Sequence, residues 1–234
     1  MKNLALWLVF VSATISYSQV DVNRFTNIVQ SLSSGSAAYG AGFQGRYDNT
    51  MEVIGDVYLD SAFTNTSFKM KGNAPSLITP ARYDIFNHEF EVKTTGGVRI
   101  LNGEMVSSFK MFKNGDSLTY VNASSYKIDN SQLLGFFELI SAGKIQLLMS
   151  SKLDVIKPSY NPSLDVGDKN SYVKRKETMY YSKNLELVKL GGKKEILGLF
   201  GTDKSKVEAF VESNDLNYKK TAALKKIFDL YNSL

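Results

Sequence analysis

The side chains that carry most enzymatic chemistry are scarce in this sequence, which has no cysteine and a single histidine, His88. Without cysteine, disulfides, thiol nucleophiles and Cys/His zinc sites are excluded. A Ser-His-Asp triad would have to use His88, which lies in a predicted hairpin turn near Asp84 and Glu89. No G-x-S-x-G nucleophile elbow is present, and turns commonly carry polar residues. The sequence therefore predicts that His88 is a solvated turn residue and not a general base.

Paired carboxylates are the next candidates, because two acids about 5–10 Å apart can hydrolyse a glycosidic bond. The pairs Glu89/Glu91 and Asp56/Asp60 alternate along predicted strands or flank them. That spacing is equally typical of the solvated face of a sheet. A hydrolase of envelope polysaccharide or lipid is thus one alternative, and a periplasmic lipid or small-ligand carrier is another.

Residues 40–45 (GAGFQG) match the dinucleotide-binding pattern G-x-G-x-x-G. In a true site this pattern follows an apolar strand and opens a helix, so that backbone N–H groups meet the pyrophosphate. Here a Ser/Gly-rich stretch precedes it and strand-like residues follow. The pattern therefore indicates a loop, and we expect neither a catalytic residue nor a cofactor or metal.

Basic residues gather towards the end of the chain. The formal net charge is +5, and residues 174–226 contain 13 basic and 7 acidic side chains. Lys219, Lys220, Lys225 and Lys226 lie in two close pairs and are predicted partner-binding residues. Such a surface can meet an acidic protein patch or an anionic membrane surface. No nucleic-acid-binding module is recognisable, so nucleic acid is not an expected partner.

The first residues have the three-part pattern of a secretory signal peptide. Lys2 precedes an apolar run over residues 4–11, and small residues at 16 and 18 predict cleavage after Ser18. Trp7, the single tryptophan, would be removed with this segment. An exported chain without cysteine is typical of a bacterial envelope protein whose core alone stabilises it, and we expect it in the periplasm.

The elements that must position these residues fall into a strand-rich body followed by helices. Turn signals at 95–97, 102–103, 114–115 and 183–184 recur between short alternating runs, as in an antiparallel meander. Helical spacing predicts helices over 20–32, 131–142, 193–199, 204–212 and 219–232. Residues 160–170 have the composition of an exposed loop.

This order indicates an α+β fold. Its body would be antiparallel and β-rich, as a meander, a curved sheet or a partly open barrel, with a C-terminal helical segment. The expected organisation is a signal peptide (1–18), an N-terminal helix with a Gly/Ser-rich connector (19–45), a β-rich domain (46–190) and helices packed on it (191–234).

Three segments carry a resemblance to a known group of proteins: residues 55–60 (GDVYLD), 82–92 (RYDIFNHEFEV) and 229–232 (DLYN). They resemble exported envelope proteins of Bacteroidetes. Accessory subunits of outer-membrane machinery in that group, including a small periplasmic plug of the type IX secretion translocon, are similar in size and character. The resemblance implies a periplasmic protein held at the outer membrane by a protein partner.

A non-catalytic protein-interaction subunit of an outer-membrane or periplasmic complex is accordingly the expected function. Its role could be to close or support a protein-secretion translocon. Tyrosine and phenylalanine bury a large area at low entropic cost, which suits protein contacts. The predicted aromatic contacts are Tyr58, Tyr83, Phe86 and Tyr120.

Overall fold

The computed structural model describes residues 53–72, 76–129, 131 and 133–234. The predicted signal peptide, N-terminal helix and Gly/Ser-rich connector lie outside these residues. The strands are β1 (Val53–Ile54), β2 (Thr64–Met70), β3 (Leu77–Asp84), β4 (Glu89–Thr94), β5 (Gly97–Asn102), β6 (Val106–Lys113), β7 (Asp116–Asn122), β8 (Phe136–Ser141), β9 (Gln146–Ile156), β10 (Ser171–Lys183) and β11 (Glu186–Lys189). The α-helices are α2 (Lys193–Gly198), α3 (Lys204–Ser213) and α4 (Thr221–Ser233).

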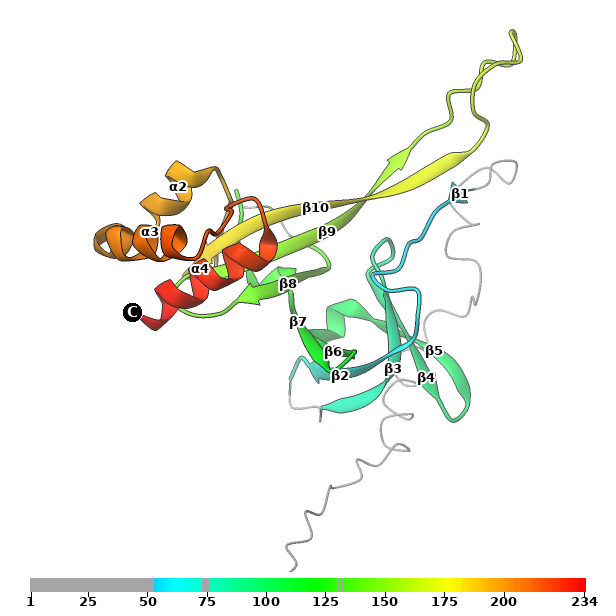
Figure 1. Ribbon diagram of the computed structural model, residues 1–234. Helices are drawn as coiled ribbons and strands as arrows, with labels where there is room; N and C mark the ends of the chain where they lie inside the picture. The colour runs from blue at the N-terminus through cyan, green and yellow to red at the C-terminus, as the bar shows by residue number, and fades with distance from the viewer. Residues whose placement is uncertain (1–52, 73–75, 130, 132) are drawn as a thin grey trace, which may run out of the picture.

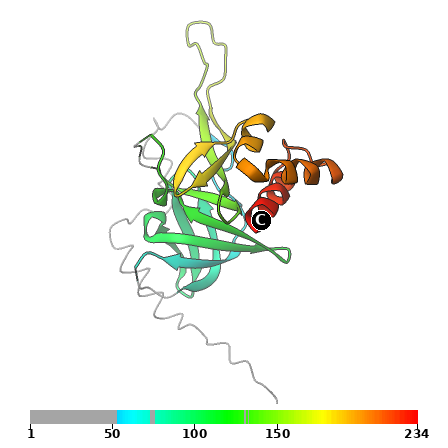
Figure 2. The same cartoon turned by 90° about the vertical axis from the view of Figure 1, so that its left-hand side faces the viewer.

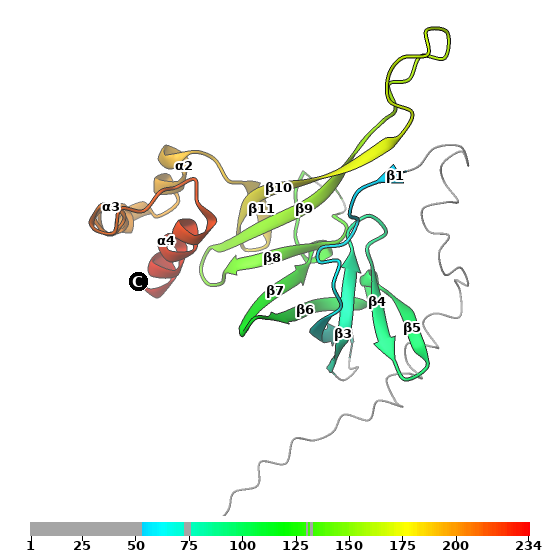
Figure 3. The ribbon, with the colours of Figure 1, turned by 45° about the vertical axis from the view of Figure 1, so that its right-hand side comes forward.

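All the strands belong to one open sheet in the order β1-β10-β9-β8-β7-β6-β2-β3-β4-β5, with β11 on β10. Every pairing is antiparallel except the short parallel pairing of β1 with β10. The sheet is strongly bent, so that β3, β4 and β5 run across the direction of β8, β9 and β10 (Figure 3). The predicted α+β class, with a β-rich antiparallel body and C-terminal helices, is confirmed.

The turn residues account for most of the meander. Asn114 (φ +54°) and Gly115 (φ +87°) take left-handed conformations between β6 and β7, as the predicted Asn-Gly turn requires. Asn102 accepts a hydrogen bond from the Glu104 backbone N–H at 2.8 Å and thereby begins the one-turn 3-10 helix Gly103–Met105. Local chemistry therefore fixes where these strands end.

The helix predicted over residues 131–142 is wrong, because this segment contains strand β8. Its apolar residues do recur at helical spacing, but β8 lies between β7 and β9 and is covered on both faces. Phe136 faces one buried cluster and Phe137 another. A strand buried on both faces loses its alternating pattern, and so imitates a helix in sequence.

Three hydrophobic clusters of the described residues share the sheet, and two of them are large. The first, here called the aromatic core, is enclosed by the bend of β2–β8 and is rich in rings, namely Phe68, Tyr83, Phe90, Phe109, Tyr120 and Phe136. The second, the helical core, lies between α2–α4 and strands β8–β10. Figures 1 and 2 show the three helices together on one side of β8, β9 and β10.

Residues 57–59 tie two distant parts of the sheet together. The Leu59 N–H donates to the Tyr83 carbonyl at 2.9 Å, and the Ile85 N–H donates to Val57 at 2.9 Å, so this segment lies along β3. From β10, the Arg175 guanidinium donates to the carbonyls of Tyr58 and Leu59. The segment therefore links β3 to β10 across the bend.

Strands β9 and β10 extend beyond the other strands and, with the loop that joins them, form a projecting arm (Figures 1 and 2). The predicted exposed loop over residues 160–170 forms the outer part of this arm, and its residues are mostly exposed. Among the described residues, none of the helices has the length and apolar character needed to cross a bilayer.

Candidate functional site

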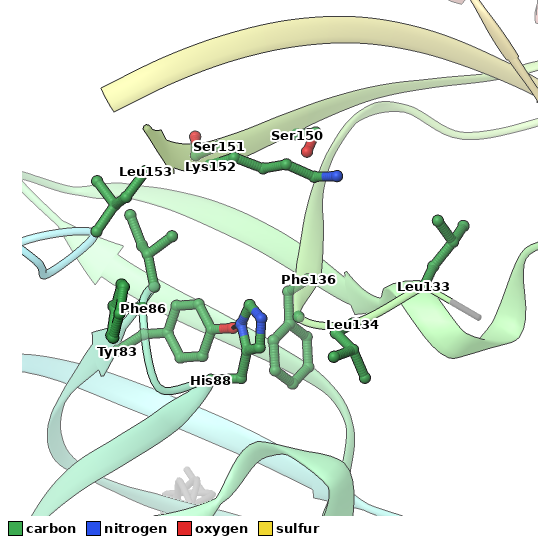
Figure 4. Close-up of a pocket in the computed structure, with 12 residues that line it drawn as sticks. Tyr83, Phe86, His88, Leu133, Leu134, Phe136, Ser150, Ser151, Lys152 and Leu153 are labelled. Atoms are coloured by element: carbon green, nitrogen blue, oxygen red, sulfur yellow. Dashed lines mark hydrogen bonds between the residues drawn. The ribbon is translucent and has the colours of Figure 1, made fainter. Parts of the chain in front are cut away.

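A cavity of about 400 Å³ lies where the β3–β4 turn approaches strand β9. Its third wall is the segment that leads into β8. Figure 4 shows Tyr83, His88 and Phe136 on one side and the β9 residues Ser150 and Lys152 on the other. The lining residues are Tyr83, Ile85, Phe86, His88, Leu133, Leu134, Gly135, Phe136, Ser150, Ser151, Lys152 and Leu153. None of these described residues is acidic.

A second cavity of about 430 Å³ adjoins the first. The two share His88 and the wall Leu133–Phe136, while the second is otherwise lined by more polar groups such as Glu89, Glu104 and Lys71. His88 and this wall therefore separate two hollows. Leu134, which is 54% exposed, lies at the outer side of the wall.

The turn that carries His88 is held by hydrogen bonds on both sides. The Asp84 carboxylate accepts from the backbone N–H groups of Phe86 at 2.8 Å and Asn87 at 2.9 Å. The carbonyl of His88 accepts from the Gly103 N–H at 3.0 Å. A Cβ atom at Gly103 would lie 2.3 Å from that carbonyl oxygen, so the approach needs glycine. His88 itself is left-handed, with φ +57°.

His88, which is half-buried, forms a pair with the buried Tyr83. The Tyr83 Oη and the His88 Nδ1 are 3.0 Å apart, and a Cβ atom at Gly135 would lie 3.0 Å from that same Nδ1. Burial raises the pKa of Tyr83 well above its ordinary value. Burial also lowers the pKa of His88, with Asp84 opposing the shift and Lys152 adding to it. The pair is therefore a neutral imidazole against a protonated phenol at neutral pH.

This pair gives the cavity a directed polar group. In the tautomer with its proton on Nε2, His88 accepts from the Tyr83 hydroxyl at Nδ1 and keeps one N–H donor. Lys152 adds a positive charge on the opposite wall. The rest of the lining combines the hydroxyl groups of Ser150 and Ser151 with aromatic rings and aliphatic side chains. Such a site can bind a small molecule that has an apolar body and an acceptor or anionic group.

The structure corrects the prediction for His88, which is half-buried against Tyr83 and not a freely solvated turn residue. It also places the other predicted acids. Glu91 accepts from Arg82 at 2.7 Å and from the Tyr58 hydroxyl at 2.6 Å, while Asp60 is paired with Lys113. Each of these two acids thus has its own cationic partner. Within the described ranges, no three His, Asp or Glu side chains gather closely enough to hold a metal ion.

The predicted aromatic contacts separate into three environments. Tyr83 and Tyr120 are only 4% and 6% exposed and belong to the aromatic core, which corrects their assignment as surface contacts. Phe86 lines the cavity. Tyr58 is half-exposed on the outer surface, where the Arg82 guanidinium lies 3.9 Å from the centre of its ring.

The predicted basic contacts are all exposed. Lys225 and Lys226 lie on α4, and the Lys225 Nζ is 2.5 Å from the Asp229 carboxylate. Lys219 and Lys220 precede α4 and border an open groove of about 690 Å³ between α2, α3 and the start of α4. None of these four lysines lines the His88 cavity or the cavity beside it, so the structure does not bring the two groups of predicted residues together.

Comparison with known proteins adds no name to this site, since no family model, no curated protein and no solved structure matches the chain. Sequence reasoning missed the wall Leu133–Phe136 and the β9 residues Ser150 and Lys152. These lie about 45 and 65 residues after His88, and only the bend of the sheet brings them to it.

Proposed function

We propose that this protein is a non-catalytic binding protein of the cell envelope whose His88 cavity takes a small amphipathic carboxylate. The observation that carries the proposal is the His88–Tyr83 pair in a cavity of mixed polar and apolar lining that has Lys152 on its opposite wall. This develops the carrier alternative from the sequence. Its volume of about 400 Å³ is in the range of small-ligand sites, about 300–1,000 Å³.

The charge of the lining supports an anionic ligand. Lys152 is the charged residue among the described residues that line the first cavity, and no lining acid opposes it. A neutral imidazole adds a donor without requiring the ligand to neutralise a second positive charge. The apolar rings and leucines would then cover a short alkyl or aromatic body. A binding role fits these contacts, since they supply affinity and orientation.

Isothermal titration with a series of straight-chain carboxylates from four to twelve carbons tests this function. We expect one chain length to bind best. Lys152→Gln should raise the dissociation constant of that carboxylate by about tenfold, which corresponds to about 1.4 kcal/mol. The matched alcohol should be affected much less by the same change. Lys157→Gln, an exposed lysine on the arm outside the cavity, is the control and should bind as the wild type does.

Two results would overturn the assignment. One is that no carboxylate of the series binds. The other is that Lys152→Gln and His88→Asn bind the best carboxylate as tightly as the wild type, which would place the ligand elsewhere. If His88→Asn binds both the carboxylate and the alcohol more weakly and circular dichroism shows that it is folded, the ligand would still lie in this cavity.

A second candidate function is the protein-interaction subunit expected from the resemblance. The observation that favours it is the exposed basic surface of Lys219, Lys220 and Lys226, which have no ion-pair partner among the described residues. The groove beside Lys219 and Lys220 is also lined by Glu212 and Asp215, so an acidic segment of an outer-membrane complex would bind at its lysine side. This surface lies apart from the cavity, so the two functions can be tested separately.

Affinity capture from native envelopes tests this second function. If it holds, a tagged chain retains an outer-membrane complex at low salt, and changing Lys219, Lys220, Lys225 and Lys226 together to Gln releases it. Lys110→Gln, which changes an exposed lysine on β6 away from the C-terminal helices and the arm, is the control. Recovery of the monomer alone after gentle detergent extraction would contradict the proposal, as would capture that is unchanged in the fourfold variant.

A further inference from the structure

The arm formed by β9 and β10 exposes apolar side chains where no part of the described chain covers them. Leu164 is 68% exposed and Val166 is 55% exposed, both in the outer loop. Figures 1 and 2 show that this loop is the part of the arm farthest from the sheet. Apolar residues exposed at the end of a projection, away from any core, are typical of a surface that contacts a partner or a membrane.

The loop has a defined shape. Asn161 and Val166 form a bridge, with the Asn161 N–H donating to the Val166 carbonyl at 2.8 Å. The Ser159 N–H donates to the Asp168 carbonyl at 3.0 Å. Gly167 has φ +98°, and a Cβ atom there would lie 2.4 Å from the Ser159 carbonyl oxygen. These hydrogen bonds hold the outermost turn, residues 162–165, in one conformation. Because the turn is ordered before it binds, the entropic cost of binding is lower.

The charges near the tip are satisfied within the loop. The Tyr160 hydroxyl donates to the Asp165 carboxylate at 2.7 Å, and the Lys169 Nζ lies 3.6 Å from it. The same ammonium is 4.3 Å from the centre of the Tyr160 ring. A hydrogen bond with the Tyr172 side chain and one from the Asn170 N–H lower the pKa of Asp168. Asp165 therefore has a cationic partner within the loop, whereas Asp168 is stabilised by neutral hydrogen-bond donors.

Behind the loop, the arm has a second apolar row and more basic than acidic side chains, with Asp154 as the register partner of Lys174. Ile54, Tyr172 and Ile156 are register partners on three adjacent strands, and so they point to the same face. Ile54 is 39% exposed and Ile156 is 51% exposed. Lys157 and Lys174 lie beside this row and have no ion pair among the described residues.

We infer that the tip of this arm docks on the surface of an anionic lipid bilayer. Along the arm, leucine and valine come first, tyrosines follow, and an excess of basic side chains lies behind them. A bilayer presents the same sequence with depth, from acyl chains through the interface that aromatic rings favour to the anionic head groups. A narrow convex tip also suits a fluid partner that needs no matching pocket.

This inference goes beyond the proposed function and does not depend on it, because no residue of the outer loop lines the His88 cavity. The test uses the exported chain after removal of residues 1–18, and vesicles of phosphatidylcholine with 30% phosphatidylglycerol. Flotation should recover the chain with these vesicles at low salt. We expect Leu164→Asp with Val166→Asp to reduce the partition coefficient at least tenfold, and Lys157→Gln with Lys174→Gln to reduce it several-fold.

Ile78→Asp is the matched control, because Ile78 is 64% exposed on β3, away from the arm. It should bind vesicles as the wild type does. Leu164→Trp adds a direct readout, since the chain without Trp7 has no tryptophan. Its emission should shift to the blue on adding anionic vesicles, whereas that of Ile78→Trp should not.

Three results would overturn the inference: no recovery of the wild type with anionic vesicles, equal binding by the Leu164/Val166 variant, or equal shifts for both tryptophan variants. If the Leu164/Val166 variant binds vesicles as the wild type does but no longer retains a protein that the wild type captures, the tip docks in a groove of that protein instead. If the tip variant binds the carboxylate as tightly as the wild type does, the arm and the cavity act separately. The failure of either proposal then leaves the other unaffected.

Discussion

The aromatic core and the helical core share one sheet but are held together differently. In the aromatic core, Phe109 stacks on Tyr120 at 4.6 Å and meets Phe90 and Phe136 edge-on at 4.9 and 5.0 Å. Phe109 and Tyr120 come from β6 and β7, which a short turn joins, whereas Phe136 comes from β8 after the connection of residues 123–135. The helical core is mostly aliphatic, and its helices follow all the strands in sequence.

The contact between α4 and the sheet depends on a few long-range polar bonds. Asn232 accepts from the Ile145 N–H at 3.0 Å and donates to the Ile145 and Ala142 carbonyls at 3.0 and 3.1 Å. The Ser141 hydroxyl donates to Asp229 at 2.6 Å. The difference teaches that strand pairing, including that of β2 with β6, builds the aromatic core, whereas side-chain hydrogen bonds help to place α4 on the helical core. Only the aromatic core has a wall in the cavity.

The largest expected effect is that of Phe109→Ala, which removes the ring at the centre of the aromatic core. We expect a loss of about 3–5 kcal/mol in the free energy of unfolding, as for other buried aromatic residues. Urea denaturation measures it. Phe112→Ala, three residues along β6 and 41% exposed, is the control and should stay within about 0.5 kcal/mol. A loss below about 1 kcal/mol for Phe109→Ala would show that the ring cluster does not hold this region.

Asn232→Ala should have a smaller and more local effect. It leaves the Ile145 backbone groups without their partner, at a cost of about 1–3 kcal/mol. We expect amide hydrogen exchange to accelerate in α4 while the strands of the aromatic core keep their protection. Asn232→Asp retains the acceptor and loses the donors. Its loss of stability should therefore lie between those of the wild type and Asn232→Ala. Equal acceleration in both regions would mean that the two cores open as one unit.

The same difference explains how much of the fold was predictable. The strands of the aromatic core follow from local turn chemistry, such as Asn114-Gly115, and were predicted with nearly correct ends. The C-terminal helices were predicted because α3 and α4 each bury one apolar stripe. Strand β8 was not, because a strand covered on both faces shows no alternation.

The candidate site was much less predictable than the fold. Alternation indicates that Tyr83 shares a face with Ala81 and Ile85, but it does not say that this face is covered. The burial of His88 depends on Phe136 and Lys152, which come from strands formed much later in the chain. Contacts of that range arise from the bend of the sheet, and no local pattern in the sequence encodes them.

The smallest expected effect concerns His88, whose pKa is lowered by burial beside the aromatic core. The unfolded chain, with a histidine pKa near 6.5, then binds a proton more readily than the folded chain. Stability from the neutral imidazole is therefore present above the unfolded pKa and is lost as the pH falls from there through the folded pKa. His88→Asn suits the positive φ and removes the bond to Tyr83, worth about 1 kcal/mol. The difference in Tm between wild type and variant should thus shrink as the pH falls from 7.5 to 5, and a constant difference would contradict a buried neutral imidazole.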